Sequence, residues 1–452
     1  MMREPAFSLL SRPIPRDLRG IRVLVLGLGD TGLSVARWVE RQGGIPRVAD
    51  TRAAPPRKAD FSGDLHSGAF TSALLNDVAL VALSPGLPLD QPLIAQARQR
   101  NIPVVGDVEL FAWQNKSKVL AITGTNGKTT VTALTGHLLR AAGVDCEVAG
   151  NIGPAVLDAL TKRSTAPAAW VLELSSYQLE TTWALKPDAA TVLNVTEDHL
   201  DRYAGLEEYA AAKARIFQGD GVQLVNRDDP RVLAMATPTR RKLTFGLDAP
   251  PSSEDFGIRD GKLVRGKHTI IEASALPIHG WHNAANALAA CALAHCLEVP
   301  VESLEQGLMT FKGLPHRLQL VGTRRGVEWY DDSKGTNVGA TIAALKGLAK
   351  PTILILGGDG KGQDFSPLAP VVAEFARRTL LIGRDAPLIE KVLAGLPVER
   401  CHSLEDAVER AAVQAQSGEA VLLSPACASF DMFRDYKHRG DAFAGALRRL
   451  PA

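Results

Sequence analysis

Cysteine is scarce in this chain of 452 residues, and the five cysteines follow no regular spacing. None of them stands in a C-x-x-C arrangement, and their number is odd. A disulfide framework or a zinc knuckle is built from an even or regularly spaced set. We therefore expect unpaired thiols, in a reducing cytoplasmic environment, at Cys146, Cys291, Cys296, Cys401 and Cys427.

The chain also lacks a strong net charge and a long apolar run. Its formal net charge of +2 is too small to bind nucleic acid through bulk charge. No stretch approaches the roughly 18 uninterrupted apolar residues of a membrane span. The N-terminus carries Arg3, Glu4, Arg12 and Asp17 where a secretory signal would be apolar. We expect a soluble monomer that binds small molecules, without nucleic acid or membrane insertion.

Short apolar runs alternate with helical patterns along most of the chain. This alternation predicts an α/β protein whose mostly parallel sheets are covered by helices. The expected strands are 21–26, 47–50, 78–83, 119–123, 169–174, 189–195, 327–330, 352–356, 380–382 and 420–423. The expected helices are 31–42, 128–143, 207–217 and 283–296, with an exposed loop at 250–256. The pattern restarts twice, which predicts three domains at 1–106, 107–313 and 314–452.

The first glycine motif, Gly27-Leu28-Gly29-Asp30-Thr31-Gly32, matches G-x-G-x-x-G between an expected strand and an expected helix. Asp50 ends the next expected strand, near the place of a ribose-binding acid. Glycines let the backbone approach a diphosphate, and the helix N-terminus offers unpaired N–H groups. The motif alone is compatible with a nicotinamide or flavin dinucleotide, with another diphosphate such as a UDP-sugar, and with a structural turn.

The second glycine motif, Gly124-Thr125-Asn126-Gly127-Lys128-Thr129-Thr130, also joins a strand to a helix. It departs from the usual G-x-x-x-x-G-K-[ST] spacing, because residue 122 is isoleucine. The working parts of a phosphate loop remain, since Lys128 can reach phosphate oxygens and the Thr129 hydroxyl can bind Mg²⁺. A glycine turn followed by a surface lysine is the structural alternative.

Acidic and polar residues follow several other expected strands. Glu173 ends one strand, and Asp198 and His199 follow another. Because the carboxyl ends of parallel strands face one crevice, these side chains can join the phosphate loop in a Mg²⁺ site. The alternative is that these side chains are solvated at the ends of their strands and bind no metal ion. Further polar groups occur at Lys213, at 282–286, and in the loops 331–337, 357–361 and 424–429.

Taken together, these segments resemble the Mur ligases of peptidoglycan synthesis, from about Ile21 to the C-terminus. The first ~19 residues lie outside the pattern. The resemblance rests on the second glycine motif and on Gly150–Gly153, Glu173–Glu180, Asn194–Asp201, His282-Asn283, Leu314–Arg317, Asp332–Lys334, Gly357–Lys361 and Leu423–Ser429. Each segment is unspecific by itself, but their combination is specific.

The resemblance implies a Rossmann-like N-terminal domain for a UDP-linked substrate, a central P-loop ATPase domain, and a Rossmann-like C-terminal domain that binds glutamate. It also implies the reaction. ATP phosphorylates the terminal carboxylate of UDP-muramoyl-alanine, and the amino group of glutamate, expected as the D-isomer, attacks the acyl phosphate to give an amide.

The resemblance also implies roles for individual residues. The catalytic residues would be Lys128, His199, Lys213 and Lys334. ATP would be bound by Gly124, Thr125, Asn126, Gly127, Lys128, Thr129, Thr130, Asn283, Asn286, His316, Arg317 and Asp332. Two Mg²⁺ sites would use Thr129, Glu173, His199 and, if it is carbamylated, Lys213.

The substrate sites follow in the same way. The UDP substrate would contact Gly29, Asp30, Thr31, Asp50, Thr51, Arg52, Ser84, Gly86, Asn151 and His199, with the acidic Asp30 acting through its backbone. Glutamate would contact Thr336, Lys361, Ser429, Phe430 and Tyr436.

Three alternatives remain open at this stage. A nicotinamide-dependent oxidoreductase would explain the first glycine motif but not the second. A folylpolyglutamate-synthetase-like ligase shares the later domains but normally lacks an N-terminal Rossmann-like domain, which argues against it. A non-catalytic binding protein would leave Lys128, Glu173 and His199 without a purpose. The sequence also does not distinguish D- from L-glutamate.

Overall fold

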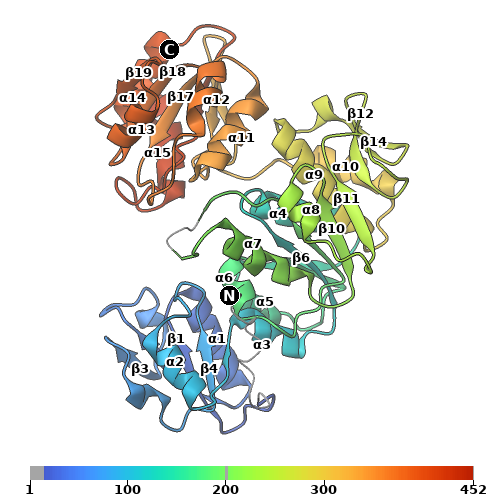
Figure 1. The fold of residues 1–452 in the computed structure, drawn as a ribbon, viewed down its shortest axis with the longest axis vertical. Coiled ribbons are helices and arrows are strands. Elements are labelled where there is room, and N and C mark those ends of the chain that lie inside the picture. Colours follow the sequence, from blue (N-terminus) through green and yellow to red (C-terminus); the bar gives the residue numbers. More distant parts are fainter. Residues whose placement is uncertain (1–14, 199–201, 451–452) are drawn as a thin grey trace.

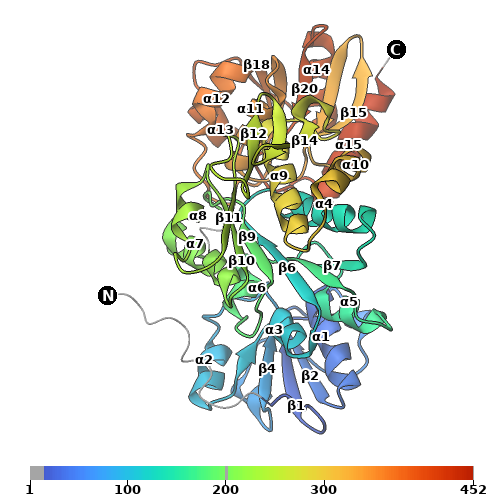
Figure 2. The same ribbon diagram turned by 90° about the vertical axis from the view of Figure 1, so that its right-hand side faces the viewer.

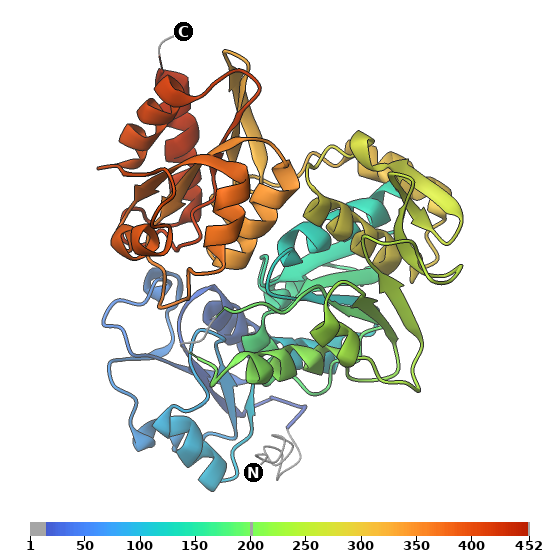
Figure 3. The same ribbon diagram turned by 45° about the horizontal axis from the view of Figure 1, so that its top comes forward.

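The computed structural model describes residues 15–198 and 202–450, which form three α/β domains in chain order. The N-terminal domain, drawn in blue, lies at one end of the molecule (Figure 1). The central domain, in green and yellow, joins it to the orange C-terminal domain. Figure 2 shows the central domain between the other two, and Figure 3 shows the C-terminal domain above the N-terminal one.

The N-terminal sheet is fully parallel, with strand order β3-β2-β1-β4-β5. Its strands are β1 (Arg22–Leu26), β2 (Ile45–Asp50), β3 (Asp64–Ser67), β4 (Leu80–Leu83) and β5 (Val104–Val105). Its helices are α1 (Asp30–Arg41) and α2 (Pro92–Gln99), followed by α3 (Asp107–Gln114). The expected strand–glycine–helix unit is confirmed, because β1 runs through the first glycine motif into α1.

The central sheet has nine strands in the order β14-β13-β12-β11-β10-β9-β6-β8-β7. Its parallel strands are β6 (Lys118–Thr123), β7 (Cys146–Gly150), β8 (Ala169–Glu173), β9 (Ala189–Val192), β10 (Val222–Asn226) and β11 (Lys242–Phe245). The antiparallel edge consists of β12 (Phe256–Arg259), β13 (Lys262–Arg265) and β14 (His268–Glu272). The expected loop at 250–256 is wrong at its end, since Phe256 is buried in β12.

The helices of the central domain cover both faces of its sheet. They are α4 (Lys128–Ala141), α5 (Val156–Lys162), α6 (Ser176–Glu180), α7 (Leu206–Ala214), α8 (Pro230–Ala234), α9 (Trp281–His295) and α10 (Val301–Thr310). The expected helix over 207–217 ends earlier, and its last turn is the 3₁₀ helix η4 (Arg215–Phe217). Helix α9 packs against α4, and its buried face is mostly alanine, which lets the two helices approach closely.

The C-terminal sheet has the order β15-β16-β20-β17-β18-β19, and only its edge pair β15–β16 is antiparallel. Its strands are β15 (Gln319–Arg324), β16 (Val327–Asp331), β17 (Thr352–Gly357), β18 (Ala376–Ile382), β19 (Val398–Arg400) and β20 (Ala420–Leu423). Its helices are α11 (Val338–Leu348), α12 (Leu368–Phe375), α13 (Ala386–Val392), α14 (Leu404–Gln414) and α15 (Tyr436–Arg449). Among the described residues, no helix combines the length and apolar character that crossing a bilayer requires.

The contacts between domains differ in kind. The N-terminal and central domains share one apolar cluster, in which α1 of the first packs against α5 of the second. Phe111 of α3, just after the boundary, belongs to this cluster and meets Trp170 of β8 edge to face at 5.1 Å. The C-terminal domain instead meets the central domain where α11 packs on α9. The shared apolar core ties the first two domains together by a strong, non-directional force.

Phe111 provides a test of this shared core. It is fully buried, so Phe111→Ala should leave a cavity and lower the free energy of unfolding by about 3–5 kcal/mol. Urea unfolding followed by fluorescence measures the change. Leu388→Ala, which truncates a side chain that is 57% exposed, is the control and should stay within about 0.5 kcal/mol of the parent protein. Equal stability of the two variants would contradict a shared core.

Candidate functional site

The second glycine motif forms a tight loop between β6 and α4. Gly124 and Gly127 both have positive φ angles, of 152° and 84°. A Cβ atom on Gly127 would lie 2.5 Å from Oδ1 of Asn286, and one on Gly124 would lie 3.0 Å from Cβ of Leu193. Both positions therefore require glycine, and the loop passes close to the N-terminal part of α9.

Asn194, which follows β9, holds two N–H groups of this loop. Its carbonyl oxygen accepts the N–H of Thr125 at 2.9 Å, and its Oδ1 accepts the N–H of Asn126 at 2.8 Å. The Nδ2 of Asn194 donates in return to the carbonyl of Asn126 at 3.1 Å. These two N–H groups, which were expected to bind phosphate, are therefore hydrogen-bonded to Asn194 within the protein.

The remaining donors lie at the start of α4. The first helical hydrogen bond runs from the N–H of Val131 to the carbonyl of Gly127. The N–H groups of Lys128, Thr129 and Thr130 precede it, so they have no acceptor within the helix. A helix N-terminus with free N–H groups and its positive dipole end is a binding site for an anion.

Two lysines converge on the carbonyl of Gly124. Lys128 Nζ lies 2.8 Å from this oxygen and 2.7 Å from the carbonyl oxygen of Thr125. Lys213 Nζ, carried by α7, lies 2.9 Å from the same Gly124 oxygen and 4.2 Å from the ring centre of Tyr209. Burial lowers the pKa of Lys128, and burial together with the charge of Lys128 lowers that of Lys213 well below its usual value.

Glu173 ends β8 beside these lysines and is 1% exposed. Its Oε1 accepts a hydrogen bond from Nδ2 of Asn151 at 2.7 Å, whereas its Oε2 is buried without a partner. A buried carboxylate oxygen without a hydrogen-bond donor costs free energy, and a bound divalent cation would give this oxygen the partner that it lacks. With the Thr129 hydroxyl nearby, this set of hard oxygen atoms fits Mg²⁺.

These groups surround a cavity of about 370 Å³, called here the lysine cavity. It is formed by the central and C-terminal domains together. Its lining includes Thr125, Asn126, Gly127, Lys128, Thr129, Asn151, Glu173, Asp198, Lys213, Arg317, Lys334, Thr336, Asn337, Lys361 and Tyr436. The structure therefore brings Lys128, Lys213 and Lys334, which lie far apart in the sequence, to one place.

Basic side chains dominate this cavity on the C-terminal side. Lys334 Nζ stacks 4.2 Å from the ring centre of Tyr436, and burial lowers its pKa to about 8. Burial also lowers the pKa of Arg317, which forms no ion pair with any described residue. Clustered cations that lack enough carboxylates require anions from outside the protein.

A second cavity of about 320 Å³, called here the asparagine cavity, adjoins the first between the central and C-terminal domains. Asn283 and Asn286 of α9 line it, together with Arg317 and Asp332. Asp332 accepts hydrogen bonds from Ser424 Oγ and from the Leu318 N–H, while burial raises its pKa to about 7. Thr130 also lines this cavity, so it meets the phosphate loop.

A third cavity of about 550 Å³, called here the N-terminal cavity, lies between the N-terminal and central domains. Asp30, Thr31 and Asn151 line it, and Asn151 also lines the lysine cavity. Asp30 is paired with Arg57 at 2.5 Å. The three cavities thus form a continuous row, from the first glycine motif past Glu173 to α9.

Asp50 does not take the open position expected of a ribose-binding acid. Its buried carboxylate accepts the N–H of Leu28 at 2.7 Å and is bound by the guanidinium of Arg52, which holds its pKa at about 2. Asp50 therefore fixes the glycine loop from within. Other residues predicted to contact the UDP substrate do not line the N-terminal cavity either. They are Gly29, Thr51, Arg52, Ser84 and Gly86.

Three further predicted residues do not line the cavities between the central and C-terminal domains. His316 places Nδ1 2.7 Å from Oδ2 of Asp331, which raises the histidine pKa. Ser429 is buried, and Phe430 is 72% exposed. None of these three lines the lysine or asparagine cavity. His199 lies outside the described residues.

The sequence reasoning missed residues that organise the site. Arg439 of α15 is buried and donates to Oγ and O of Ser333 and to the carbonyl of Cys427. It thereby ties together the loops after β16 and β20. Asn194 and Asn337 lie in segments that the sequence reasoning named, but it assigned them no role. Their position directly after a strand or before a helix was the available signal, but many polar residues share it.

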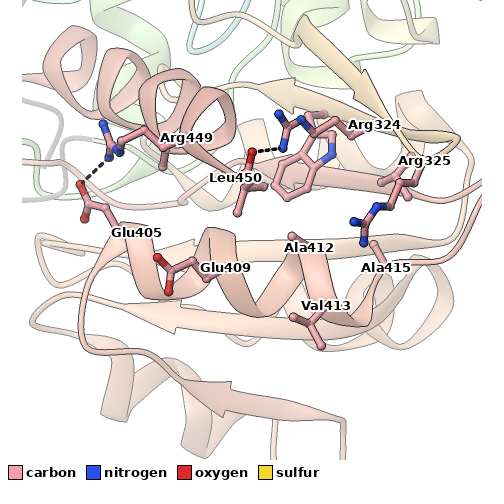
Figure 4. Close-up of a pocket in the computed structure, with 12 residues that line it drawn as sticks. Arg324, Arg325, Glu405, Glu409, Ala412, Val413, Ala415, Arg449 and Leu450 are labelled. Atoms are coloured by element: carbon pink, nitrogen blue, oxygen red, sulfur yellow. Dashed lines mark hydrogen bonds and ion pairs between the residues drawn. The ribbon is translucent and has the colours of Figure 1, made fainter. Parts of the chain in front are cut away.

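A larger cavity, of about 640 Å³, lies elsewhere in the C-terminal domain. Figure 4 shows its walls, with Ala412 and Val413 on α14, Arg324 bonded to the carbonyl of Leu450, and Arg449 facing Glu405. It contains no residue of the glycine loops or of the strand ends that carry them. Size alone therefore does not mark the candidate site.

Comparison with known proteins agrees with this architecture. Three family models match successive parts of the chain: "Mur ligase MurD-like, N-terminal domain" over residues 21–106, "Mur ligase middle domain" over 122–294, and "Mur ligase, glutamate ligase domain" over 316–427. The matched ranges correspond to the three sheets.

Curated relatives extend over nearly the whole chain. The UDP-N-acetylmuramoylalanine–D-glutamate ligase of Nitrosospira multiformis is 54% identical, covering 96% of this chain and 97% of its own length. The enzyme of the same name from Thiobacillus denitrificans is 53% identical, covering 96% and 98%.

Solved structures share the fold at lower identity. UDP-N-acetylmuramate-alanine ligase MurC from Thermotoga maritima is 18% identical with a TM-score of 0.61, covering 95% of this chain and 99% of its own. MurF from Acinetobacter baumannii is also 18% identical with a TM-score of 0.61, covering 96% and 92%. On the matched domains and the near-complete relatives together, the chain belongs to the Mur ligase family.

Proposed function

We propose that this protein uses ATP to join D-glutamate to the alanine carboxyl group of UDP-N-acetylmuramoyl-L-alanine, releasing ADP and phosphate, in the synthesis of peptidoglycan precursors. The observation that carries the proposal is the convergence of Lys128, Lys213, Arg317 and Lys334 on the lysine cavity beside the unpartnered oxygen of Glu173. The names of the relatives support the choice of substrates.

The reaction needs two anions to meet. The alanine carboxylate attacks the γ-phosphorus of ATP, the bond to the β-phosphate oxygen breaks, and ADP leaves. The amine of glutamate then attacks the acyl carbon, loses a proton, and displaces phosphate. Both steps gather negative charge at one point, and preorganised cations in a water-poor cavity stabilise such charge far better than water does.

ATP is assigned to the asparagine cavity and the phosphate loop. The base and ribose fit between α9 and the C-terminal domain, where Asn283, Asn286 and Asp332 offer polar atoms. The phosphates then meet the free N–H groups of Lys128, Thr129 and Thr130. Lys128 Nζ donates to the carbonyls of Gly124 and Thr125, and the third N–H of its ammonium group remains for a phosphate oxygen.

Magnesium is assigned to the same region. Thr129 and Glu173 would hold one ion, and His199 with a carbamylated Lys213 would hold a second. Bound Mg²⁺ supplies positive charge that offsets the repulsion between phosphate and carboxylate. The buried, unpartnered Oε2 of Glu173 supports the first site.

The UDP-linked substrate is assigned to the N-terminal cavity, so that residues 1–106 serve its nucleotide end. Asn151 lies between this cavity and the lysine cavity, which suits a contact with the muramoyl-alanine portion. Residues 107–313 carry the ATP site, and residues 314–452 bind glutamate. Thr336, Lys361 and Tyr436 line the lysine cavity from that side, and Lys361 is a natural partner for a glutamate carboxylate.

Lys213 has the environment that carbamylation requires. Carbon dioxide reacts with a neutral amine, and burial together with the charge of Lys128 lowers the Lys213 pKa, which favours the neutral form. The ammonium first loses one proton to give the neutral amine; addition of CO₂ then forms an N–C bond and releases a second proton, so a cation becomes an anion able to bind a metal. We further propose that the protein acts in the cytoplasm, which its five unpaired cysteines support. We also propose that it acts as a monomer.

The substrate assignment is tested by turnover. Full ADP release should require both UDP-N-acetylmuramoyl-L-alanine and D-glutamate, because the acyl phosphate forms only on the first and is consumed by the second. A coupled ADP assay with each substrate omitted in turn measures this, and L-glutamate replaces the D-isomer as a stereochemical control. Equal ADP release without the muramoyl substrate would refute the proposal.

Lys128→Ala tests the phosphate role. Removing this cation should lower kcat/KM by about 10³-fold or more, since an interaction made mainly in the transition state is lost. Steady-state kinetics measure the effect. Lys267→Ala removes an exposed lysine on the same domain and should leave the rate unchanged. A near-normal rate for Lys128→Ala would contradict the proposal that Lys128 contacts a phosphate in the transition state.

Lys213 carbamylation is tested independently of activity. After incubation with ¹³C-bicarbonate, the parent protein should show a carbamate carbon signal by NMR, and Lys213→Ala should not. The signal should rise with pH through the lowered Lys213 pKa, because only the neutral amine reacts. The same signal in both proteins would place the carbamate elsewhere, and its absence from both would exclude it.

A further inference from the structure

Two asparagines join the phosphate loop to the C-terminal domain. Asn337 Nδ2 donates to Oδ1 of Asn126 at 3.1 Å, and Asn126 Nδ2 donates to Oδ1 of Asn337 at 3.4 Å. The residues are 211 positions apart in the chain. The two amide groups therefore form a reciprocal pair across the boundary between two domains.

Each asparagine is fixed by its own domain. The main chain of Asn126 is held by Asn194 through two hydrogen bonds. Asn337 is the N-cap of α11, where its Oδ1 accepts the N–H of Ala340 at 2.8 Å, and it is only 6% exposed. Because each residue of the pair is anchored in its own domain, the position of one domain determines the position of the other residue. A pair of mobile surface side chains has no such effect.

The Asn337 amide uses all of its hydrogen-bonding capacity. Its two N–H groups serve Asn126 and Oδ2 of Asp198, the latter at 3.3 Å, and its oxygen accepts from Ala340 and Asn126. An amide offers two donors and two acceptor lone pairs, so none remains. Serine or aspartate can cap a helix equally well, but neither can make this set of contacts.

The pair lies where two of the cavities meet. Asn126 lines both the lysine cavity and the asparagine cavity, and Asn337 lines the former. Gly339, in the first turn of α11, lines the latter, and a Cβ atom there would lie 3.4 Å from Nδ2 of Asn126. The contact thus sits between the two substrates that the proposed reaction brings together.

A second contact fixes the same helix at its other end. Gly347 of α11 lies against Gly280 and His282, which precede and begin α9. Its missing Cβ leaves room for the His282 ring, since a Cβ there would lie 2.7 Å from Nδ1. With the asparagine pair at its N-terminus, α11 is held at two points, so its docking on the central domain has one defined geometry.

We propose that Asn337 is a positioning residue that couples docking of the C-terminal domain to the arrangement of the phosphate loop. This inference rests on the proposed function. When the domain docks, Asn337 fixes Asn126, and the same movement brings Lys334 and Lys361 to the lysine cavity. The amine of glutamate is then in place when the acyl phosphate forms, and water is kept from it.

The matched variants are Asn337→Ser, Asn126→Ala and their combination. Asn337→Ser keeps a capping oxygen for α11 and removes the amide. Each single change should lower kcat about 10-fold, with the KM for ATP changed less than about 3-fold, because docking and not nucleotide affinity is affected. If the residues act as a pair, the double variant should lose no more than either single variant, whereas independent effects would multiply to about 100-fold.

Two controls separate positioning from folding. Ser403→Ala removes the N-cap of α14 in the same domain, far from the loop, and should leave kcat within about twofold. Asn337→Asp keeps the cap and the shape but places a carboxylate oxygen against Oδ2 of Asp198, so it should not restore the rate. Restoration by aspartate, or multiplicative losses in the double variant, would overturn the proposal.

Small-angle X-ray scattering tests the coupling without turnover. With ADP present, Asn337→Ser should show a larger radius of gyration than the parent protein and Ser403→Ala, since the docked arrangement loses a contact. An unchanged radius would overturn the proposal. If the parent protein releases no ADP in response to its substrates, the proposed function fails, and the scattering result still decides whether the pair holds the domains together.

Discussion

The gathering of like charges in one cavity is the constraint on which the rest of the structure depends. Lys128 and Lys213 share the carbonyl of Gly124, although two ammonium groups repel each other there. The repulsion and the burial are tolerable because backbone oxygens, the Glu173 carboxylate and incoming anions compensate them. The positive φ angle of Gly124 and the parallel strands β6, β8 and β9 are the means by which the chain builds this arrangement.

The sequence predicted the parts of this site that depend on local pattern. The strand–glycine–helix units, the positions of Lys128 and Glu173, and the α/β class follow from periodicity and from the glycines. The commitment of two loop N–H groups to Asn194 did not follow, because it depends on the register between β6 and β9. The role of Asn337 did not follow either, since its partner Asn126 lies in another domain.

The first glycine motif shows how a correct local prediction leaves the ligand open. The strand, the turn and the helix all form as expected, but Asp50 turns inward to the Leu28 N–H and Arg52. In the cavity nearby, Asp30 is paired with Arg57. A spacing rule records where an acidic residue stands in the chain, not which groups its carboxylate binds. Family membership therefore favours a UDP-linked substrate over a dinucleotide.

The unequal joints between the domains have a consequence for the order of events. The first two domains share a common apolar core, in which α1 packs against α5, while the third domain meets the second through one helix and a few polar groups. The first two domains are thus joined by apolar packing, and the third is attached to them by fewer contacts. We expect the UDP-linked substrate and ATP to bind to the first two domains before glutamate. Glutamate then binds last, when the C-terminal domain docks.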